Sequence, residues 1–285
     1  MKLVFRSARW LTRSLAVVLL VIAGSTLLVR FAPGYFSDAR EMDARFARMA
    51  RAESAAERQR SGQLGSLFRV EIADWVYRAG GTSRQFGIPV AELIRPRLAV
   101  SGVLLLQSVL LGWSLALCAS ITVSIRRNGS LGWQSPATIL LAVPVAALAT
   151  LCRLTGVGGP VLVMALLLAA RDFKFLYRAV RKAWFDSFAL QARAQGIGLP
   201  RLMTAHVLPA IAPDCAALMS LSIVTALSAL VPVEVIFNIP GVGQLAWNAA
   251  LNRDLPVLLA VTIIMAIAVV LSGLGTHSAD DWKRA

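Results

Sequence analysis

The most restrictive feature of the sequence is a series of six stretches that contain no Asp, Glu, Lys or Arg. They are 16, 28, 25, 17, 19 and 25 residues long: Ser14–Val29, Leu98–Ile125, Asn128–Cys152, Leu154–Ala170, Cys215–Val233 and Leu255–Ala279. A helix that crosses a lipid bilayer needs about 17–25 mainly apolar residues, and in lipid the backbone must satisfy its own hydrogen bonds. We therefore expect an all-α, polytopic membrane protein with six transmembrane helices.

Two other interpretations of these stretches fit less well. A soluble helical protein would carry about 25% charged residues, whereas this chain has 15% charged and 57% hydrophobic residues. The basic segment before the first stretch is typical of a signal peptide. However, no small-residue cleavage pattern follows the apolar core, which continues into RFAPGYF. We expect an uncleaved first span.

The distribution of Lys and Arg predicts the orientation of the spans. With the N-terminus inside, the four cytoplasmic segments carry 4, 2, 7 and 2 basic residues, while the two short outer loops carry one each, Arg153 and Arg253. Basic residues concentrate in short cytoplasmic segments. The long outer segment (32–97) is largely exempt from this rule, because it is longer than about 60 residues. Both termini are thus expected in the cytoplasm, and the net charge of +14 does not indicate a nucleic-acid partner.

The residue types that perform chemistry are scarce. The sequence has no phosphate-binding G-x-x-x-x-G-K-[ST] pattern, and its two histidines, His206 and His277, are too far apart in sequence to form a paired metal motif. Asp214 and Glu234 lie at the ends of the fifth stretch, and ionisable residues are almost absent within the spans, which disfavours an ion-coupled carrier. We expect no enzymatic activity, no metal and no cofactor. Any energy that the activity of this chain requires must therefore come from a partner.

One cytoplasmic segment has strong helix punctuation. Asp186 or Ser187 is a suitable N-cap for a short helix, and Gly196 is a suitable residue just after its end. Pro200 is expected in the first turn of a second helix, which Pro209 would close.

The first of these helices has a stripe of apolar residues that become small along the chain: Phe185, Phe188, Ala189 and Ala192. Such a face can enter a groove on a partner closely, or it can pack on its own domain. The pattern of residues leaves both possibilities open.

The spacing in this segment resembles a known signature. ABC importer permeases carry E-A-A, three residues, Gly, nine residues, then I-x-L-P. Ala192, Gly196, His206, Leu208 and Pro209 keep that spacing here. A second match follows the fifth stretch, on the pattern E-x-x-F-x-x-P-G-x-G…R-D-x-P. Its residues are Glu234, Phe237, Pro240, Gly241, Gly243, Arg253, Asp254 and Pro256. Together the two motifs resemble the oligopeptide/dipeptide (nickel) branch of the type I ABC importer permeases.

The resemblance implies partners and a division of the chain. It implies a multi-pass protein of the bacterial inner membrane that pairs with a second six-span permease, two cytoplasmic ATPases and an extracytoplasmic solute-binding protein. The expected parts are a cytoplasmic N-terminus with the first helix (1–31), an extracytoplasmic segment (32–97), a five-helix core (98–279) containing a cytoplasmic coupling loop (171–210), and a tail (280–285).

The resemblance also implies roles for residues. Contact with the ATPases is expected from the coupling segment, through Ala189, Ala192, Arg193, Gly196, His206, Leu208 and Pro209. The second motif is expected to form an extracytoplasmic hairpin. Leu190, Gln191 and Tyr35 depart from the family pattern. They motivate an alternative, a membrane scaffold or regulatory subunit that keeps the permease fold without transporting anything.

Overall fold

The structure is a computed structural model that describes residues 81–83, 85–125, 134–252 and 254–273, together with Ala16, Leu20 and Gly24. Within these ranges the chain is mostly helical, and the only β contact is an isolated bridge between Thr82 and Pro89. Most of the first predicted span, most of segment 32–97 with Tyr35, residue Arg253 and the tail lie outside the described residues.

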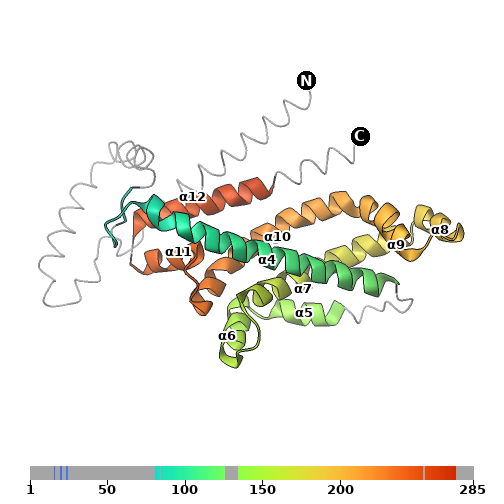
Figure 1. The fold of residues 1–285 in the computed structure, drawn as a ribbon, viewed down its shortest axis with the longest axis horizontal. Helices are drawn as coiled ribbons and strands as arrows, with labels where there is room; N and C mark the ends of the chain where they lie inside the picture. The colour runs from blue at the N-terminus through green and yellow to red at the C-terminus, as the bar shows by residue number, and fades with distance from the viewer. Residues whose placement is uncertain are drawn as a thin grey trace, which may run out of the picture. The chain divides into compact units, whose positions relative to one another are not determined.

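The described helices follow one another along the chain (Figure 1). They are α4 (Val90–Ile125), α5 (Gln134–Ala142), α6 (Val145–Thr155), α7 (Pro160–Trp184), α8 (Ser187–Ala194), α9 (Leu199–Leu202), the π-helix η3 (Met203–Val207), α10 (Leu208–Phe237), α11 (Val242–Leu251) and α12 (Leu255–Ser272). The chain divides into two units. One comprises Met1–Leu98 and Leu245–Ile267, and the other Ala99–Gln244 and Ala268–Ala285.

Among the described residues, two continuous helices are long and apolar enough to cross a membrane. They are α4, with 36 residues, and the run Leu199–Phe237, with 39 residues, which joins α9, η3 and α10. The predicted stretches Leu98–Ile125 and Cys215–Val233 lie inside them. Many of the apolar side chains on α4 are exposed, as lipid or a partner helix would require.

The third predicted stretch differs from the expectation of one helix. It contains α5 and α6, which are separated at Pro144. Proline has no N–H to donate and disfavours helical geometry in the residue before it. The helix is therefore interrupted at Pro144. The fourth stretch also differs, because α7 continues without interruption from Pro160 to Trp184. Residues 171–184 are therefore helical rather than part of a loop.

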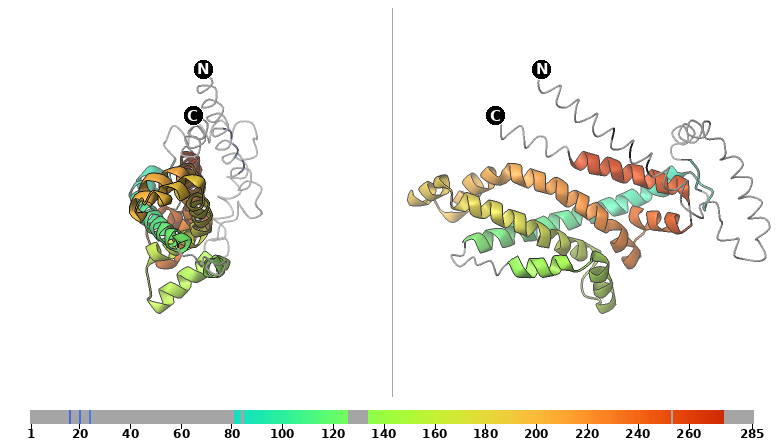
Figure 2. Two further views of the ribbon diagram at one scale, coloured as in Figure 1. Left: turned by 90° about the vertical axis from the view of Figure 1, so that its right-hand side faces the viewer. Right: turned by 180° about the vertical axis from the view of Figure 1, so that it is seen from behind.

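In the second unit, α7 and α10 run side by side (Figure 2). α4 also approaches α7 closely, at Gly112. A Cβ built on Gly112 would lie 2.9 Å from the Leu168 Cβ and 3.0 Å from the Ala165 carbonyl oxygen. Small residues allow two helix backbones to approach in this way inside a membrane.

Polar side chains also join α7 to α10. The Ser222 hydroxyl donates to Asp172 Oδ2 at 2.7 Å, and the Arg171 guanidinium donates to the Leu221 carbonyl oxygen at 2.9 Å. Asp172 is fully buried, and Ser222 belongs to the predicted span Cys215–Val233. Asp172 lies just beyond the fourth predicted stretch, so the expectation that ionisable residues are almost absent from the spans stays a prediction.

Candidate functional site

The short helix α8 begins where its capping residue predicts. Asp186 is extended, and its carboxylate accepts a hydrogen bond from the Ser187 N–H at 2.6 Å. A carboxylate at this position satisfies one of the free N–H groups of the first turn. Of the two predicted N-cap residues, Asp186 is the one that caps the helix.

The end of α8 is formed by Gly196 in the left-handed conformation, with φ of 77°. The Gly196 N–H donates to the Arg193 carbonyl at 3.0 Å, and the Ile197 N–H donates to the Ala192 carbonyl at 3.2 Å. This pair of bonds is the Schellman motif, so the predicted helix end at Gly196 is confirmed. No atom lies within 4 Å of a Cβ built on Gly196. The constraint is therefore on the backbone, and a side chain there would obstruct nothing in this chain.

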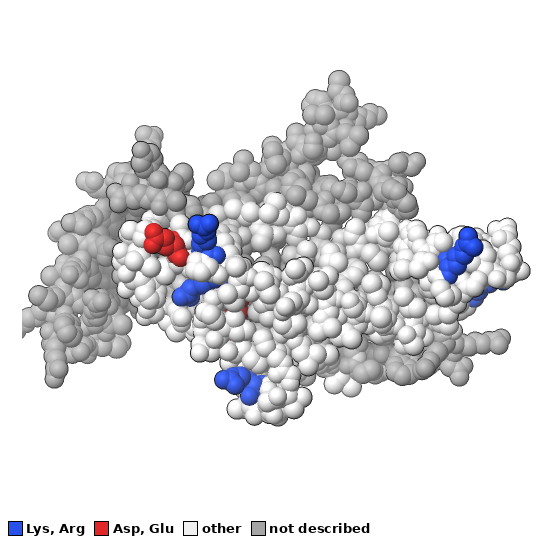
Figure 3. Space-filling view, viewed as in Figure 1, with Lys and Arg blue, Asp and Glu red and all other residues white. Residues whose placement is uncertain are grey.

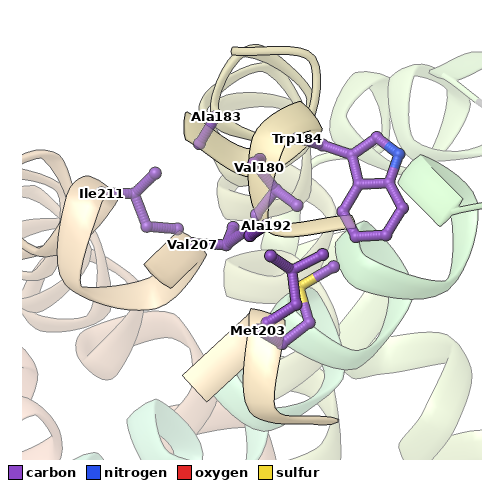
Figure 4. Packing of buried hydrophobic residues seen from close by; sticks show 9 residues of the cluster. Val180, Ala183, Trp184, Ala192, Met203, Val207 and Ile211 are labelled. Carbon is purple, nitrogen blue, oxygen red and sulfur yellow. The ribbon is translucent and has the colours of Figure 1, made fainter. Parts of the chain in front are cut away.

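The small face of α8 is buried against its own domain. Ala189 is 0% exposed and Ala192 5% exposed. They belong to a buried cluster that Figure 4 shows from close by: Val180, Ala183, Trp184, Ala189, Ala192, Leu202, Met203, Val207 and Ile211. Of the two possibilities that the sequence left open, the structure shows packing on its own domain, because the segment's own helices cover this face.

The outward side of the segment carries other apolar residues. Phe185 is 56% exposed, Leu190 51% and Leu199 45%. Figure 3 shows basic residues over α8 and α9, with little charge on the visible surface between these helices and α6. Exposed apolar side chains beside basic residues are the composition expected of a protein contact.

Arg193 is half-buried, and its guanidinium contacts its own domain. Its Nη2 donates to the Trp184 carbonyl at 2.6 Å and its Nε to the Ala189 carbonyl at 3.2 Å. The guanidinium carbon lies 4.4 Å from the centre of the Trp184 ring. Arg193 therefore joins the last turn of α8 to the last residue of α7.

The second predicted helix does not end at Pro209. Pro209 lies in the first turn of α10, and the π-helix η3 leads into it without a break. The Leu208 N–H donates five residues back, to the Met203 carbonyl. This wider turn lets the chain continue where a proline ring would otherwise clash with the preceding turn. Within the continuous helix Leu199–Phe237, His206 and Leu208 are half-buried and Pro209 is exposed.

The second motif is organised around the Glu234 carboxylate, which is fully buried. It accepts hydrogen bonds from the N–H groups of Gly243, at 2.7 Å, and Gln244, at 3.1 Å. It also accepts one from the Ser101 hydroxyl of α4, at 2.6 Å, and that hydroxyl accepts from the Val242 N–H at 2.8 Å. Glu234 and Ser101 together satisfy the free N–H groups at the start of α11.

The glycines of this motif make room for that carboxylate. A Cβ on Gly241 would overlap the Glu234 carboxyl group. A Cβ on Gly243 would lie 2.8 Å from the Val231 Cα. Upstream of them, Phe237 is half-buried and ends α10, and Pro240 is exposed.

The later residues of the motif lie in the other unit. Asp254 is buried, and its carboxylate accepts hydrogen bonds from the Ser83 hydroxyl and, at 3.3 Å, from the Gln85 N–H. Pro256 lies in the first turn of α12. Two carboxylates of the motif thus hold two separate hydrogen-bond networks. Sequence reasoning missed Ser101 and Ser83, which are 133 and 171 residues from their partners.

Residues 108–282, more than half of the chain, match the family of binding-protein-dependent transport system inner membrane components. The chain belongs to that family. It is therefore a membrane protein and a permease subunit of an ABC importer, which is a transporter family and not an enzyme family. This membership does not favour the alternative of a non-transporting scaffold.

Relatives of this transport family cover the chain to different extents. The metal-staphylopine import system permease protein CntB of Staphylococcus aureus is 27% identical over 234 residues, which cover 71% of this chain and 72% of CntB. The oligopeptide transport system permease protein AppB of Bacillus subtilis is 33% identical over 114 residues, 39% of this chain and 36% of AppB. The Escherichia coli protein OppB, of the same description, is 36% identical over 81 residues, 28% of this chain and 26% of OppB.

The geometry at Gly196 gives a test of the coupling segment. Replacing Gly196 with valine forces a β-branched residue into the left-handed region at a cost of about 1–2 kcal/mol. We expect this to displace Ile197 from the cluster and to lower solute uptake in intact cells roughly 5–30-fold. Asparagine tolerates this conformation, so Gly196→Asn should transport nearly as well as wild type. Equal loss in both variants would show that backbone geometry is not the constraint.

Proposed function

We propose that this permease subunit carries peptides or a similar small polar solute across the bacterial inner membrane. The observation that supports the proposal most strongly is the similarity to CntB over 71% of the chain. AppB and OppB are named for oligopeptides and CntB for metal-staphylopine. A peptide or a small polar solute is therefore the class we assign.

In this proposal the chain has six transmembrane helices, with both termini in the cytoplasm. It forms half of the translocation path together with a second six-span permease. Two ATPases bind on the cytoplasmic side, and a solute-binding protein delivers the solute from outside. The proposed parts of the chain are those expected from the sequence: 1–31, 32–97, 98–279 with the coupling segment in 171–210, and 280–285.

This topology predicts which residues are accessible from each side. In a variant without the native cysteines, a cysteine at Ser54 should react with a membrane-impermeant thiol reagent added outside intact cells. A cysteine at Ser187 should react only after the cells are opened, because the basic residues of its segment favour the cytoplasm. Reaction of both cysteines from the same side would contradict the proposed topology.

The coupling segment is proposed to contact the ATPases through its outward side. Phe185, Leu190 and Leu199 are the exposed apolar residues there, and Ala189, Ala192 and Gly196 hold the helix that presents them. His206, Leu208 and Pro209 connect the segment to α10. ATP-driven closure of the ATPases would move α8 and α9, and α7 and α10 would tilt as packed bodies between inward and outward access.

The second motif is proposed to fix the outer ends of the helices. The Glu234 network joins α4, α10 and the start of α11 through hydrogen bonds to a buried carboxylate. The Asp254 network joins the turn before α4 to the start of α12. Gly241 and Gly243 are proposed to make room for the Glu234 network. Phe237 and Pro240, and in the other unit Arg253 and Pro256, are proposed to lie on the outer side of the membrane, where the solute-binding protein would dock.

Purification of the tagged permease from its native membrane tests this function. We expect the second permease and the ATPases to co-purify with it. A Leu190→Lys variant would place an unpaired charge in the apolar contact. We expect it to retain about one tenth or less of the ATPase, which corresponds to about 1.4 kcal/mol. Gln191→Lys adds the same charge at a neighbouring exposed position on a different side of α8 and should retain the ATPases. Wild-type protein without any ATPase would contradict the proposal.

A further inference from the structure

We propose that Arg193 is a positioning residue that makes α8 and α7 move as one body. The inference rests on the proposed function, because it takes the ATPases to act on α8. Arg193 would transmit a displacement of α8 to the membrane helices and would not itself bind the ATPases.

The covalent connection between the two helices is short and offers little stiffness. α7 ends at Trp184 and α8 begins at Ser187, so only Phe185 and Asp186 separate them. Phe185 is in a non-helical conformation and Asp186 is extended. A two-residue turn of this kind can act as a hinge, because a change in a few dihedral angles reorients a whole helix.

The packing of α8 alone resists such a hinge motion weakly. α8 has eight residues, and its fully buried side chains are the methyl groups of Ala189 and Ala192. Phe188 is only partly buried against the cluster. Small side chains bury little apolar area, so they hold a helix less firmly than leucines in the same positions would.

Arg193 connects α8 to α7 across this two-residue turn. Its guanidinium donates to the Trp184 carbonyl at 2.6 Å and stacks over the Trp184 ring, with 4.4 Å from the guanidinium carbon to the ring centre. The two contacts act in different directions, one on the backbone of α7 and one on the face of its last side chain. The last turn of α8 is thereby linked to the last residue of α7.

Trp184 in turn contacts the buried cluster of the second unit. It is buried in the cluster with Val180 and Ala183 of α7, Met203 and Val207 of η3, and Ile211 of α10. Figure 4 shows these side chains converging from the different elements. Arg193 therefore links α8 to the same core that joins α7 to the start of α10.

The chemistry requires arginine in particular. A guanidinium is planar, so it can stack on an indole and donate hydrogen bonds in its own plane at the same time. A lysine ammonium can keep the charge and one hydrogen bond but not both contacts. Arg193→Lys should therefore retain part of the effect, while Arg193→Gln and Arg193→Ala should lose it.

The experiment measures movement of each helix in the assembled complex, without depending on the solute. The permease, with its three native cysteines replaced by alanine, is co-purified with its ATPases. A single cysteine is then placed at Gln191 on α8 or at Arg178 on α7, both exposed positions. Thiol labelling rates are compared with and without ATP and vanadate, which traps the closed ATPases.

In the wild-type background we expect trapping to change labelling at both positions. In Arg193→Ala and Arg193→Gln, the ATPases should remain bound and the change at position 191 should persist. The change at position 178 should fall about fivefold or more, the lower range of measured coupling between sites. Lys182→Ala, an exposed cation of α7, should behave as wild type.

The outcomes separate this inference from the proposed function. Loss of the ATPases in the Arg193 variants would mean that Arg193 binds them or that the segment has unfolded, and it would overturn the positioning role. An unchanged response at position 178 would overturn it as well. A wild-type permease that retains no ATPase would overturn the proposed function and the inference with it.

Discussion

Replacing Glu234 with alanine is expected to remove most of the folded permease from the membrane. The carboxylate accepts hydrogen bonds from the Gly243 and Gln244 N–H groups and from the Ser101 hydroxyl. Each buried donor left without an acceptor costs about 1–3 kcal/mol. Their sum is a large part of the 5–15 kcal/mol by which domains of ordinary size are typically stable.

Immunoblots of membrane fractions and thermal unfolding in detergent measure this effect. Glu234→Gln keeps one acceptor oxygen but turns an NH₂ group toward the donors, so its loss should be intermediate. Glu92→Ala removes an exposed carboxylate at the start of α4 and should accumulate like wild type. Wild-type stability in Glu234→Ala would show that the network does not hold the ends of α4, α10 and α11 together.

Replacing Gly112 with alanine is the second change with a large expected effect. Its new Cβ would lie 2.9 Å from the Leu168 Cβ and 3.0 Å from a backbone oxygen of α7. Because a backbone atom cannot rotate away, α4 and α7 must separate, and overpacking of this kind typically costs about 1–3 kcal/mol.

Gly102 provides a matched control for Gly112 on the same helix. A Cβ built on Gly102 has no atom within 4 Å, and alanine favours a helix by about 1 kcal/mol over glycine. Gly102→Ala should therefore be neutral or stabilising in a thermal unfolding experiment, while Gly112→Ala lowers the unfolding temperature. Equal effects from the two substitutions would contradict the close packing of α4 on α7.

The parts of the fold that depend on neighbouring residues were predictable from the sequence. Asp186 and Gly196 delimit α8 because a cap and a left-handed glycine act on the backbone next to them. The apolar stretches at 98–125 and 215–233 lie in continuous helices for the same reason. Pro144 shows the limit of this reasoning, because the absence of charge predicted a single helix where a proline separates two.

The parts that depend on distant residues were not predictable. The periodicity of α8 identified the face formed by Ala189 and Ala192, but only the tertiary structure shows that Trp184 and Val207 belong to the cluster that covers it. The same limit applies to Ser101, because a serine in an apolar stretch gives no sign that a carboxylate 133 residues away will accept a hydrogen bond from it. Pro209 was misinterpreted because a π-turn, which has no sequence signature of its own, carries the helix past it.

Crosslinking from α8 tests most directly whether this permease is driven through its cytoplasmic segment. A photoreactive residue at Leu190, which is 51% exposed on α8, is compared with one at Leu221, which is 49% exposed on α10. After irradiation of native membranes, the crosslinked chains are identified by mass spectrometry. We expect Leu190 to crosslink to an ATPase subunit and Leu221 to crosslink to lipid or the second permease. Crosslinks to the ATPase from Leu221 but not from Leu190 would contradict the account.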